Sequence, residues 1–258
     1  MNLNQYLKRI GASNPSKTEL SYLSHLQQQH VRKVPFENLD VISHYPLSLQ
    51  IADLYHKIVV QERGGICHEL NGLFHHLITN LGFQAHLHAA TTHIGTGWFP
   101  IENTHVFNLV LLNNKHYLVD VGLGGKSPAK PVPLTGEEIK DVDGWYRVIR
   151  EEDVFYLQKK ANKDWNILYC FTTVKKELQD FEPICQWMQT SPESPFNKRL
   201  LLSKVNEKGR VTLAGNSLTI VKENEKTKKK LKVNEIRDKI KHYFGLNDSF
   251  QLNDAIVE

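Results

Sequence analysis

The sequence predicts an α+β fold in which helices come first, strands follow, and a small mixed segment ends the chain. Apolar residues recur at helical spacing up to about residue 83, whereas short β-rich runs separated by turn residues occupy residues 84–175. Helices and strands do not alternate, which argues against a parallel βαβ sheet. The chain has 258 residues, of which 40% are hydrophobic, so it can form two or three subdomains.

Four helices are expected in the first part of the chain. Residues 3–10 have apolar side chains at helical spacing, and Gly11 stops this run. The Ser-x-x-Glu pattern of residues 16–19 is typical of a capping box ahead of a second helix. Helical spacing returns around residues 51–58, and it begins again near Cys67.

Six short β-rich runs are expected to form an antiparallel sheet or a small barrel. They are residues 86–92, 105–112, 116–122, 145–150, 154–159 and 165–171. A proline cluster follows at residues 190–196. Residues 210–221 then predict a hairpin that turns near Gly215 and Asn216, and a helix from about Asn234 ends the chain.

The composition argues against several classes of protein. No apolar run approaches the ~18 residues of a membrane span, and the first ten residues lack a secretory segment, so the cytosol is expected. Three widely spaced cysteines fit a reducing compartment rather than a disulfide framework. Much of the net charge of +4 lies in residues 226–232. Without interleaved aromatics they indicate a solvated loop rather than a nucleic-acid surface, although attraction of an anionic cofactor stays open.

Cys67 lies where a nucleophile would be favoured. Gly64 and Gly65 permit a sharp turn and a close backbone approach, and Gly65 as N-cap would place Cys67 in the first helical turn. Free N–H groups and the positive end of the helix dipole favour a thiolate there, whereas Glu69 opposes it. A nucleophilic cysteine also requires a base.

A base is suggested by the hairpin that residues 105–120 would form. A two-residue turn at Asn113 and Asn114 makes Asp120 a diagonal neighbour of His105, about 7–8 Å away on the same face. A three-residue loop would instead place the two on opposite faces. In the favoured register Asp120 orients the imidazole, which can then take a proton from the cysteine in a catalytic triad.

Four segments, in order, resemble the arylamine N-acetyltransferase family. They are PFENL at 35–39, RGGICHELN at 63–71, THVFNLV at 104–110 and YLVDVGLG at 117–124. The later SPESPF and the terminal HYFGL are similar more loosely, so the resemblance covers nearly the whole chain. It implies a cysteine-protease-like core with a helical bundle at residues 1–83, an antiparallel β-barrel at 84–190 and an α/β lid at 191–258.

The resemblance also implies a chemistry. By motif position the triad is Cys67, His105 and Asp120. Acetyl-coenzyme A is the implied donor, with no metal, and an arylamine, arylhydrazine or N-hydroxyarylamine is the implied acceptor. The implied mechanism is ping-pong, through an acetyl-cysteine intermediate.

Other residues receive roles by the same resemblance. Phe36 resembles an aromatic that lines the acceptor pocket. Gly124 and Gly125 suit close backbone approach to the donor or acceptor, and Phe196 is expected to contact coenzyme A. Leu123 stands where the family often has an aromatic residue, which would reshape the acceptor pocket and its preference for flat amines. Phe36 and Leu123 are therefore the expected substrate contacts.

Arg63 and Glu37 are expected to form an ion pair that ties the first loop to the helix of the cysteine.

Rival hypotheses about the function also follow from the residues. Another acyl-transfer enzyme with the same Cys, His, Asp order, such as a papain-like peptidase or a transglutaminase, shares the triad. A metalloenzyme would need a zinc pattern that the histidines near Cys67 do not provide. A binding module would leave Cys67 buried and inert.

Overall fold

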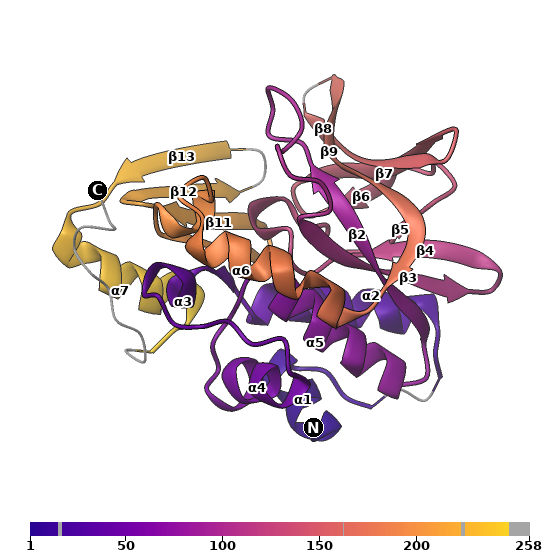
Figure 1. Ribbon diagram of the computed structural model, residues 1–258, viewed down its shortest axis with the longest axis horizontal. Coiled ribbons are helices and arrows are strands. Elements are labelled where there is room, and N and C mark those ends of the chain that lie inside the picture. The colour runs from indigo at the N-terminus through magenta and orange to yellow at the C-terminus, as the bar shows by residue number, and fades with distance from the viewer. Residues whose placement is uncertain (15–16, 162, 223–224, 248–258) are drawn as a thin grey trace.

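The structure is a computed structural model that describes residues 1–14, 17–161, 163–222 and 225–247, and it has the predicted α+β fold (Figure 1). The helices are α1 (Leu3–Ile10), α2 (Leu20–Lys33), α3 (Leu39–Ile42), α4 (Ile51–Tyr55), α5 (Cys67–Asn80), α6 (Glu182–Thr190) and α7 (Val233–Phe244), with short π- or 3-10 turns at η1 (His56–Val60), η2 (Gly124–Lys126), η3 (Leu178–Phe181) and η4 (Pro195–Asn197). The strands are β1 (Phe36–Glu37), β2 (Gln84–Thr92), β3 (His105–Leu112), β4 (Lys115–Val119), β5 (Val132–Pro133), β6 (Ile139–Asp141), β7 (Gly144–Glu151), β8 (Val154–Ala161), β9 (Asp164–Lys176), β10 (Leu201–Asn206), β11 (Gly209–Ala214), β12 (Ser217–Lys222) and β13 (Glu225–Lys230).

The N-terminal helices largely follow the apolar spacing. α1 ends at Gly11, whose left-handed φ of 72° favours glycine. The helix expected around residues 51–58 is α4, continued by the single π-turn η1. The predicted capping box is wrong: α2 begins at Leu20 with Glu19 as N-cap and no side-chain cap bond, and Ser16 lies outside the described residues. No helix in the described part of the chain is long and apolar enough to cross a membrane.

The central strands form one eight-stranded antiparallel sheet in the order β5-β4-β3-β2-β9-β8-β7-β6. The sheet curls into a near-closed barrel because β5 at one edge lies against β7 (Figure 1). Its interior is filled by aromatic rings, with Phe107 packed edge-on to Phe171 at 4.7 Å and tilted against Tyr169 at 5.5 Å. The six predicted runs lie in this barrel, and the short strands β5 and β6 are additional.

The β3–β4 hairpin has the favoured register. Leu112 pairs with Lys115 across the turn, as predicted. Asn113 and Asn114 both have positive φ angles, 51° and 58°, which a two-residue type I′ turn requires. β4 ends at Val119, so the aspartate that follows is free of the strand ladder.

The C-terminal part is a five-stranded sheet in the order β1-β10-β11-β12-β13, covered by α7 (Figure 1). The predicted hairpin is confirmed, because Ala214 pairs with Ser217 around its turn. The predicted terminal helix is also confirmed, and it ends at Gly245, whose φ is 73°. β1 joins this sheet through Phe36, which pairs with Ser203, so an N-terminal motif is built into the C-terminal layer.

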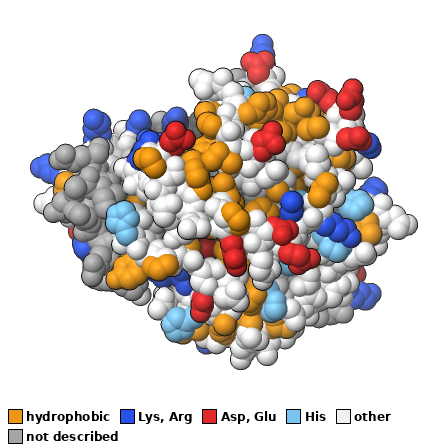
Figure 2. Space-filling view, in the orientation of Figure 1, with side chains coloured by type: hydrophobic (Ala, Val, Ile, Leu, Met, Phe, Trp, Pro, Cys, Tyr) orange, Lys and Arg blue, Asp and Glu red, His pale blue; other side chains and the backbone are white. Residues whose placement is uncertain are grey.

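The basic run at residues 226–232 differs from the expectation of a loop. Its residues up to Lys230 form the edge strand β13, which pairs with β12 along its whole length and is exposed throughout. Figure 2 shows Lys and Arg side chains along the upper left of the molecule, where Figure 1 places this strand. Lysines on an exposed edge strand hinder pairing with a strand of another molecule. The basic run therefore has a structural role in the sheet, and its side chains remain solvated.

Candidate active site

Cys67 is the first residue of α5, as the two preceding glycines suggested. A side chain at Gly64 would meet the Pro35 carbonyl oxygen at 2.0 Å, so this close approach requires glycine. The predicted N-cap is wrong by one position, because Ile66 and not Gly65 caps the helix. Cys67 therefore begins the first turn, where unpaired N–H groups favour a negative sulfur.

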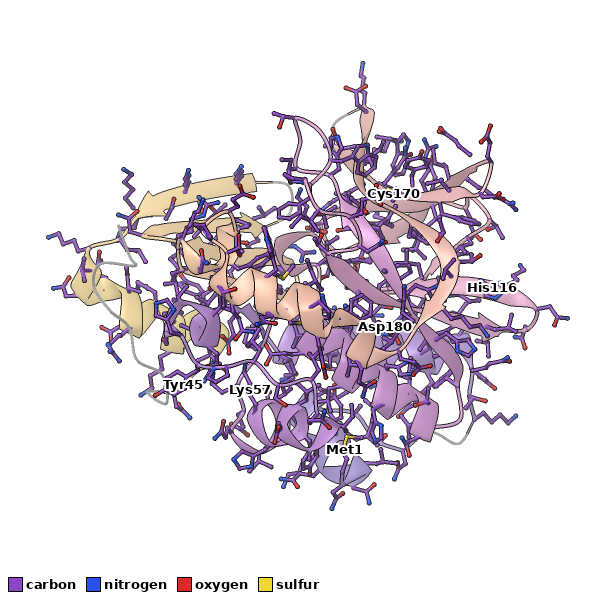
Figure 3. The ribbon with its side chains drawn as sticks, in the orientation of Figure 1. Met1, Tyr45, Lys57, His116, Cys170 and Asp180 are labelled. Carbon is purple, nitrogen blue, oxygen red and sulfur yellow. The ribbon has the colours of Figure 1, made fainter. Side chains whose placement is uncertain are left out.

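A largely buried network of ion pairs fixes the loop that leads into this helix. The predicted Arg63–Glu37 pair is present at 2.8 Å, and Arg63 also contacts Asp40 at 2.7 Å. Lys57 joins Asp40 to Glu69, at 2.6 and 2.7 Å. Glu69 in turn accepts a hydrogen bond of 2.9 Å from the backbone N–H of the N-cap residue, so its carboxylate organises the helix start. Lys57 is labelled in Figure 3 beside α4.

His105 and Asp120 meet as the hairpin register predicted. Nε2 of His105 lies 2.7 Å from Oδ2 of Asp120, and the two residues are only 3% and 0% exposed. Because Nε2 is bonded to the carboxylate, Nδ1 is the ring nitrogen left for Cys67. Cys67 and His105 are close enough for their side chains to hydrogen-bond, so the structure brings the three predicted triad residues together from α5, β3 and the segment after β4.

Asp120 is held by residues that the sequence reasoning missed. Asn71 Nδ2 donates to Asp120 Oδ1 at 2.9 Å and to the Val106 carbonyl at 2.7 Å. The Tyr169 hydroxyl donates to Asp120 Oδ2 at 3.1 Å, and the Gly122 N–H donates to Oδ1 at 2.8 Å. Asn71 could have been found, since it lies four residues after Cys67 and thus one helical turn along the same face.

The electrostatics of the site favour a charged pair. Burial raises the pKa of the Cys67 thiol, but the charges of His68 and His105, with hydrogen bonds from both, lower it from 9.0 to about 6. Burial lowers the pKa of His105, whereas Asp120 and Cys67 raise it from 6.5 to about 9. Between these two pH values a thiolate and an imidazolium can coexist. Burial raises the pKa of Asp120, but His105, Asn71 and the Gly122 N–H outweigh it and hold that pKa below its usual range.

Four of the other predicted site residues lie on the side of the site that faces the C-terminal sheet. Phe36 is 7% exposed, and its ring lies 6.3 Å from that of Phe196, which comes from η4. Gly124 has a left-handed φ of 61°, and a side chain there would meet the Phe36 ring at 3.4 Å. Gly125 lies over the hydroxyl groups of Thr212 and Ser203, on the β10–β11 face. These contacts place the segment after Asp120 against both Phe36 and the C-terminal sheet.

Leu123 differs from these neighbours in its packing. It is half-buried and contacts the cluster of side chains that fills the barrel. The other two cysteines are also free of disulfides: Cys170 lies on β9 in the barrel (Figure 3), and Cys185 is buried on α6. Among the residues that the structure describes, no cluster of three metal-ligating side chains is present.

Comparison with known proteins extends the likeness beyond these residues. The model of an N-acetyltransferase family matches residues 19–252. An arylamine N-acetyltransferase of Mycolicibacterium smegmatis is 30% identical over 226 residues, which cover 85% of this chain and 82% of that protein.

Solved structures agree with the sequence comparison. A structure of the M. smegmatis arylamine N-acetyltransferase has a TM-score of 0.92 at 28% identity, covering 100% of this chain and 98% of its own. Arylamine N-acetyltransferase of Mycobacterium marinum in complex with CoA has a TM-score of 0.89 at 29% identity, covering 95% of this chain and 93% of its own. The similarity therefore extends through both sequence and fold.

Proposed function

The chain belongs to the arylamine N-acetyltransferase family, and from this premise we propose that it moves an acetyl group from acetyl-coenzyme A to the nitrogen of arylamines, arylhydrazines or N-hydroxyarylamines. The observation that carries the proposal is the buried His105–Asp120 bond of 2.7 Å beside Cys67, whose pKa is lowered to about 6. Such an arrangement supplies a thiolate nucleophile and an imidazolium that can protonate the leaving group at neutral pH.

In the first half-reaction, Sγ of Cys67 attacks the carbonyl carbon of the acetyl thioester. The bond from that carbon to the coenzyme A sulfur breaks, and the leaving thiolate takes the proton held by the His105 imidazolium. Asp120 keeps the ring in place through Nε2 and stabilises its positive charge. The acetyl group is then stored as a thioester on Cys67.

In the second half-reaction, the amine nitrogen attacks the carbonyl carbon of acetyl-Cys67. His105, now neutral, accepts the proton that the nitrogen loses. The bond from the carbon to Sγ breaks, and the electron pair returns to sulfur, which regenerates the thiolate–imidazolium pair. The favourable pKa values of Cys67 and His105 explain why one pair of residues can serve both halves.

We place the donor along the segment that follows Asp120. A cavity of about 620 Å³ lies between the barrel and the C-terminal sheet, and Lys126 and Lys226 are among its lining residues. Lys126 directly follows Gly125, so this cationic cavity continues from the glycines that allow close approach. Phosphate groups of coenzyme A are the anions it would attract, with the acyl end reaching toward Gly124 and Phe196.

We place the acceptor beside Phe36, with Leu123 as a further contact. An aromatic ring would pack favourably on the Phe36 side chain. Leu123 supplies an aliphatic wall in place of a ring, so aliphatic-substituted arylamines should be accepted as well as flat ones. The required free thiol at Cys67 suits a reducing compartment, and we propose the cytosol as the place of action.

The test is a panel of amines and hydrazines with acetyl-coenzyme A, in which release of the coenzyme A thiol is measured. The proposal expects release that depends on an aromatic amine or hydrazine, with parallel lines in double-reciprocal plots. Release that is unaffected by any amine would instead favour the rival hydrolase.

Phe36→Leu is a specificity probe, and we expect it to raise KM for the amine more than KM for the donor.

A further inference from the structure

A second imidazole contacts the Cys67 sulfur besides that of His105. Nδ1 of His68 lies 3.5 Å from Cys67 Sγ, within hydrogen-bonding distance for sulfur. The His68 side chain is 0% exposed, and its ring packs against Phe181, with 5.3 Å between centroids. Cys185 of α6 is also close enough to interact with the His68 side chain. The ring is therefore fixed in the interior, with one nitrogen directed at the reacting atom.

The unpaired nitrogen of this ring indicates where its proton lies. Nε2 of His68 is buried and has no hydrogen-bond partner. If the proton were on Nε2, a buried N–H donor would be left unpaired, which proteins avoid more strongly than an unpaired acceptor. With the proton on Nδ1, the N–H points at a sulfur that can accept it. The geometry thus favours His68 as a donor to Cys67.

We propose that His68 donates a hydrogen bond from Nδ1 to the Cys67 sulfur and so stabilises the thiolate, in addition to His105. The inference rests on the proposed role of Cys67 as the nucleophile. The same hydrogen bond would stabilise the attacking sulfur in the first half-reaction and the departing sulfur in the second. No proton is transferred by His68, because the amine proton passes to His105.

The other ionisable groups near the Cys67 sulfur are paired elsewhere or neutral. His68 is therefore the group available to donate this second hydrogen bond. Nε2 of His105 is bonded to Asp120. Burial raises the pKa of Cys185, which favours its neutral thiol. Glu69 is paired with Lys57 at 2.7 Å and with a backbone N–H. Burial opposes a charge on His68, yet the charge of the Cys67 thiolate raises its pKa well above the usual value, and Nδ1 donates in either protonation state.

The experiment measures how the rate of Cys67 alkylation by iodoacetamide depends on pH in two variants. His68→Phe keeps a ring against Phe181 and removes the donor. We expect it to raise the apparent pKa of Cys67 by about one unit, which slows alkylation below pH 6 about tenfold. His68→Asn places an amide N–H where Nδ1 was, and it should restore most of the wild-type profile.

A matched control is His30→Phe. His30 is also fully buried, packs edge-on against Phe74 with 5.1 Å between ring centroids, and has unpaired ring nitrogens, so the substitution should leave the Cys67 profile unchanged. A wild-type profile in His68→Phe, or no difference between the Phe and Asn variants, would overturn the proposal. Should His68→Phe fail to fold, ¹⁵N-histidine NMR of the wild-type protein decides, since an unprotonated Nδ1 at His68 excludes a donor. If Cys67 of the wild-type protein is not acetylated by acetyl-coenzyme A, the proposed function itself is contradicted.

Discussion

Asp120 accepts hydrogen bonds from two side chains besides His105, and from one backbone N–H. Asn71 and Gly122 bond to one carboxylate oxygen, and Tyr169 shares the other with the imidazole. This full set of donors favours the ionised carboxylate and fixes its direction. Orientation of His105 is therefore built into the ground state and need not be created on substrate binding.

Replacing Asp120 with Asn should lower kcat severely, by about 10⁴-fold, because the amide cannot hold the required tautomer of His105. Steady-state acetylation of a good arylamine measures the effect. Asp141→Asn is the matched control: Asp141 is a second buried barrel carboxylate, bonded to the N–H groups of Ala129 and Val142, and this variant should keep near-normal turnover. Near-normal turnover in Asp120→Asn would remove Asp120 from the mechanism.

The candidate triad could be predicted because local signals placed each member. Two glycines marked the start of the helix at Cys67, and one turn geometry fixed the relation of His105 to Asp120. The contact of His68 with the sulfur could not be predicted in this way. It depends on the rotamer of His68 and on Phe181 from a distant segment, which no spacing within the motif specifies.

The first turn of α5 packs directly on the loop after Asp120. A side chain at Gly122 would meet Cys67 Cα at 2.8 Å and Asn71 Nδ2 at 2.6 Å. Both neighbours belong to the helix that carries the nucleophile. The distance between the sulfur and the imidazole is therefore set by how closely this helix and loop approach, and only glycine permits that approach.

Gly122→Ala should separate the two elements and misalign the triad. We expect a loss of about 1–3 kcal/mol in the free energy of unfolding, measured in urea, together with a large fall in kcat. Gly95→Ala is the comparison, since a side chain there meets nothing within 4 Å although its φ of 95° adds backbone strain. If Gly122→Ala retains full turnover, the close packing is not what aligns the site.

Elements with strong periodicity or clear turn residues could be predicted, and short or fully exposed ones could not. The β3–β4 and β11–β12 hairpins had turn residues that define their register. β5 and β6 are too short to show alternation, and β13 has no apolar face at all. α6 follows directly from η3 and starts near Pro183, which disguised its helical spacing.

Arg210 joins the barrel to the C-terminal sheet. It lies on β11, is 4% exposed, and its guanidinium bonds to Asp143 at 2.9 Å. The same group donates to the carbonyls of Gly124 and Ser127, at 3.1 and 2.9 Å. One side chain thus ties the sheet to a barrel turn and to the segment proposed to approach the donor.

Arg210→Met should destabilise the protein by about 3 kcal/mol, because Asp143 stays buried with Lys159 as its remaining cationic partner. KM for acetyl-coenzyme A should also rise, because the carbonyls of Gly124 and Ser127 lose the hydrogen bonds from Arg210 that hold this segment in place. Arg150→Met is the control, since its 60% exposed side chain pairs with the exposed Asp153 and should change stability by less than about 0.5 kcal/mol. Equal losses of stability in the two variants would show that the buried contacts of Arg210 do not stabilise the fold.

The order of helices, barrel and mixed layer could be predicted, but the connections between the layers could not. β1 comes from residues 36 and 37 and pairs with β10, more than 160 residues later, and no local pattern indicates such a partner. Leu39 likewise packs in the apolar cluster beneath α7. The division into three domains at residues 83 and 190 stays a prediction. Residues 36–39 link the first of these domains to the last.

The most direct test is a brief incubation of the wild-type protein with acetyl-coenzyme A and no amine, followed by peptide mass spectrometry. The account predicts an acetyl group on Cys67, none on Cys170 or Cys185, and its transfer when an arylamine is added. Cys67→Ala should keep the fold and form neither adduct nor product. Amine acetylation that proceeds at the wild-type rate in Cys67→Ala, or without acetylation of this cysteine, would contradict the account.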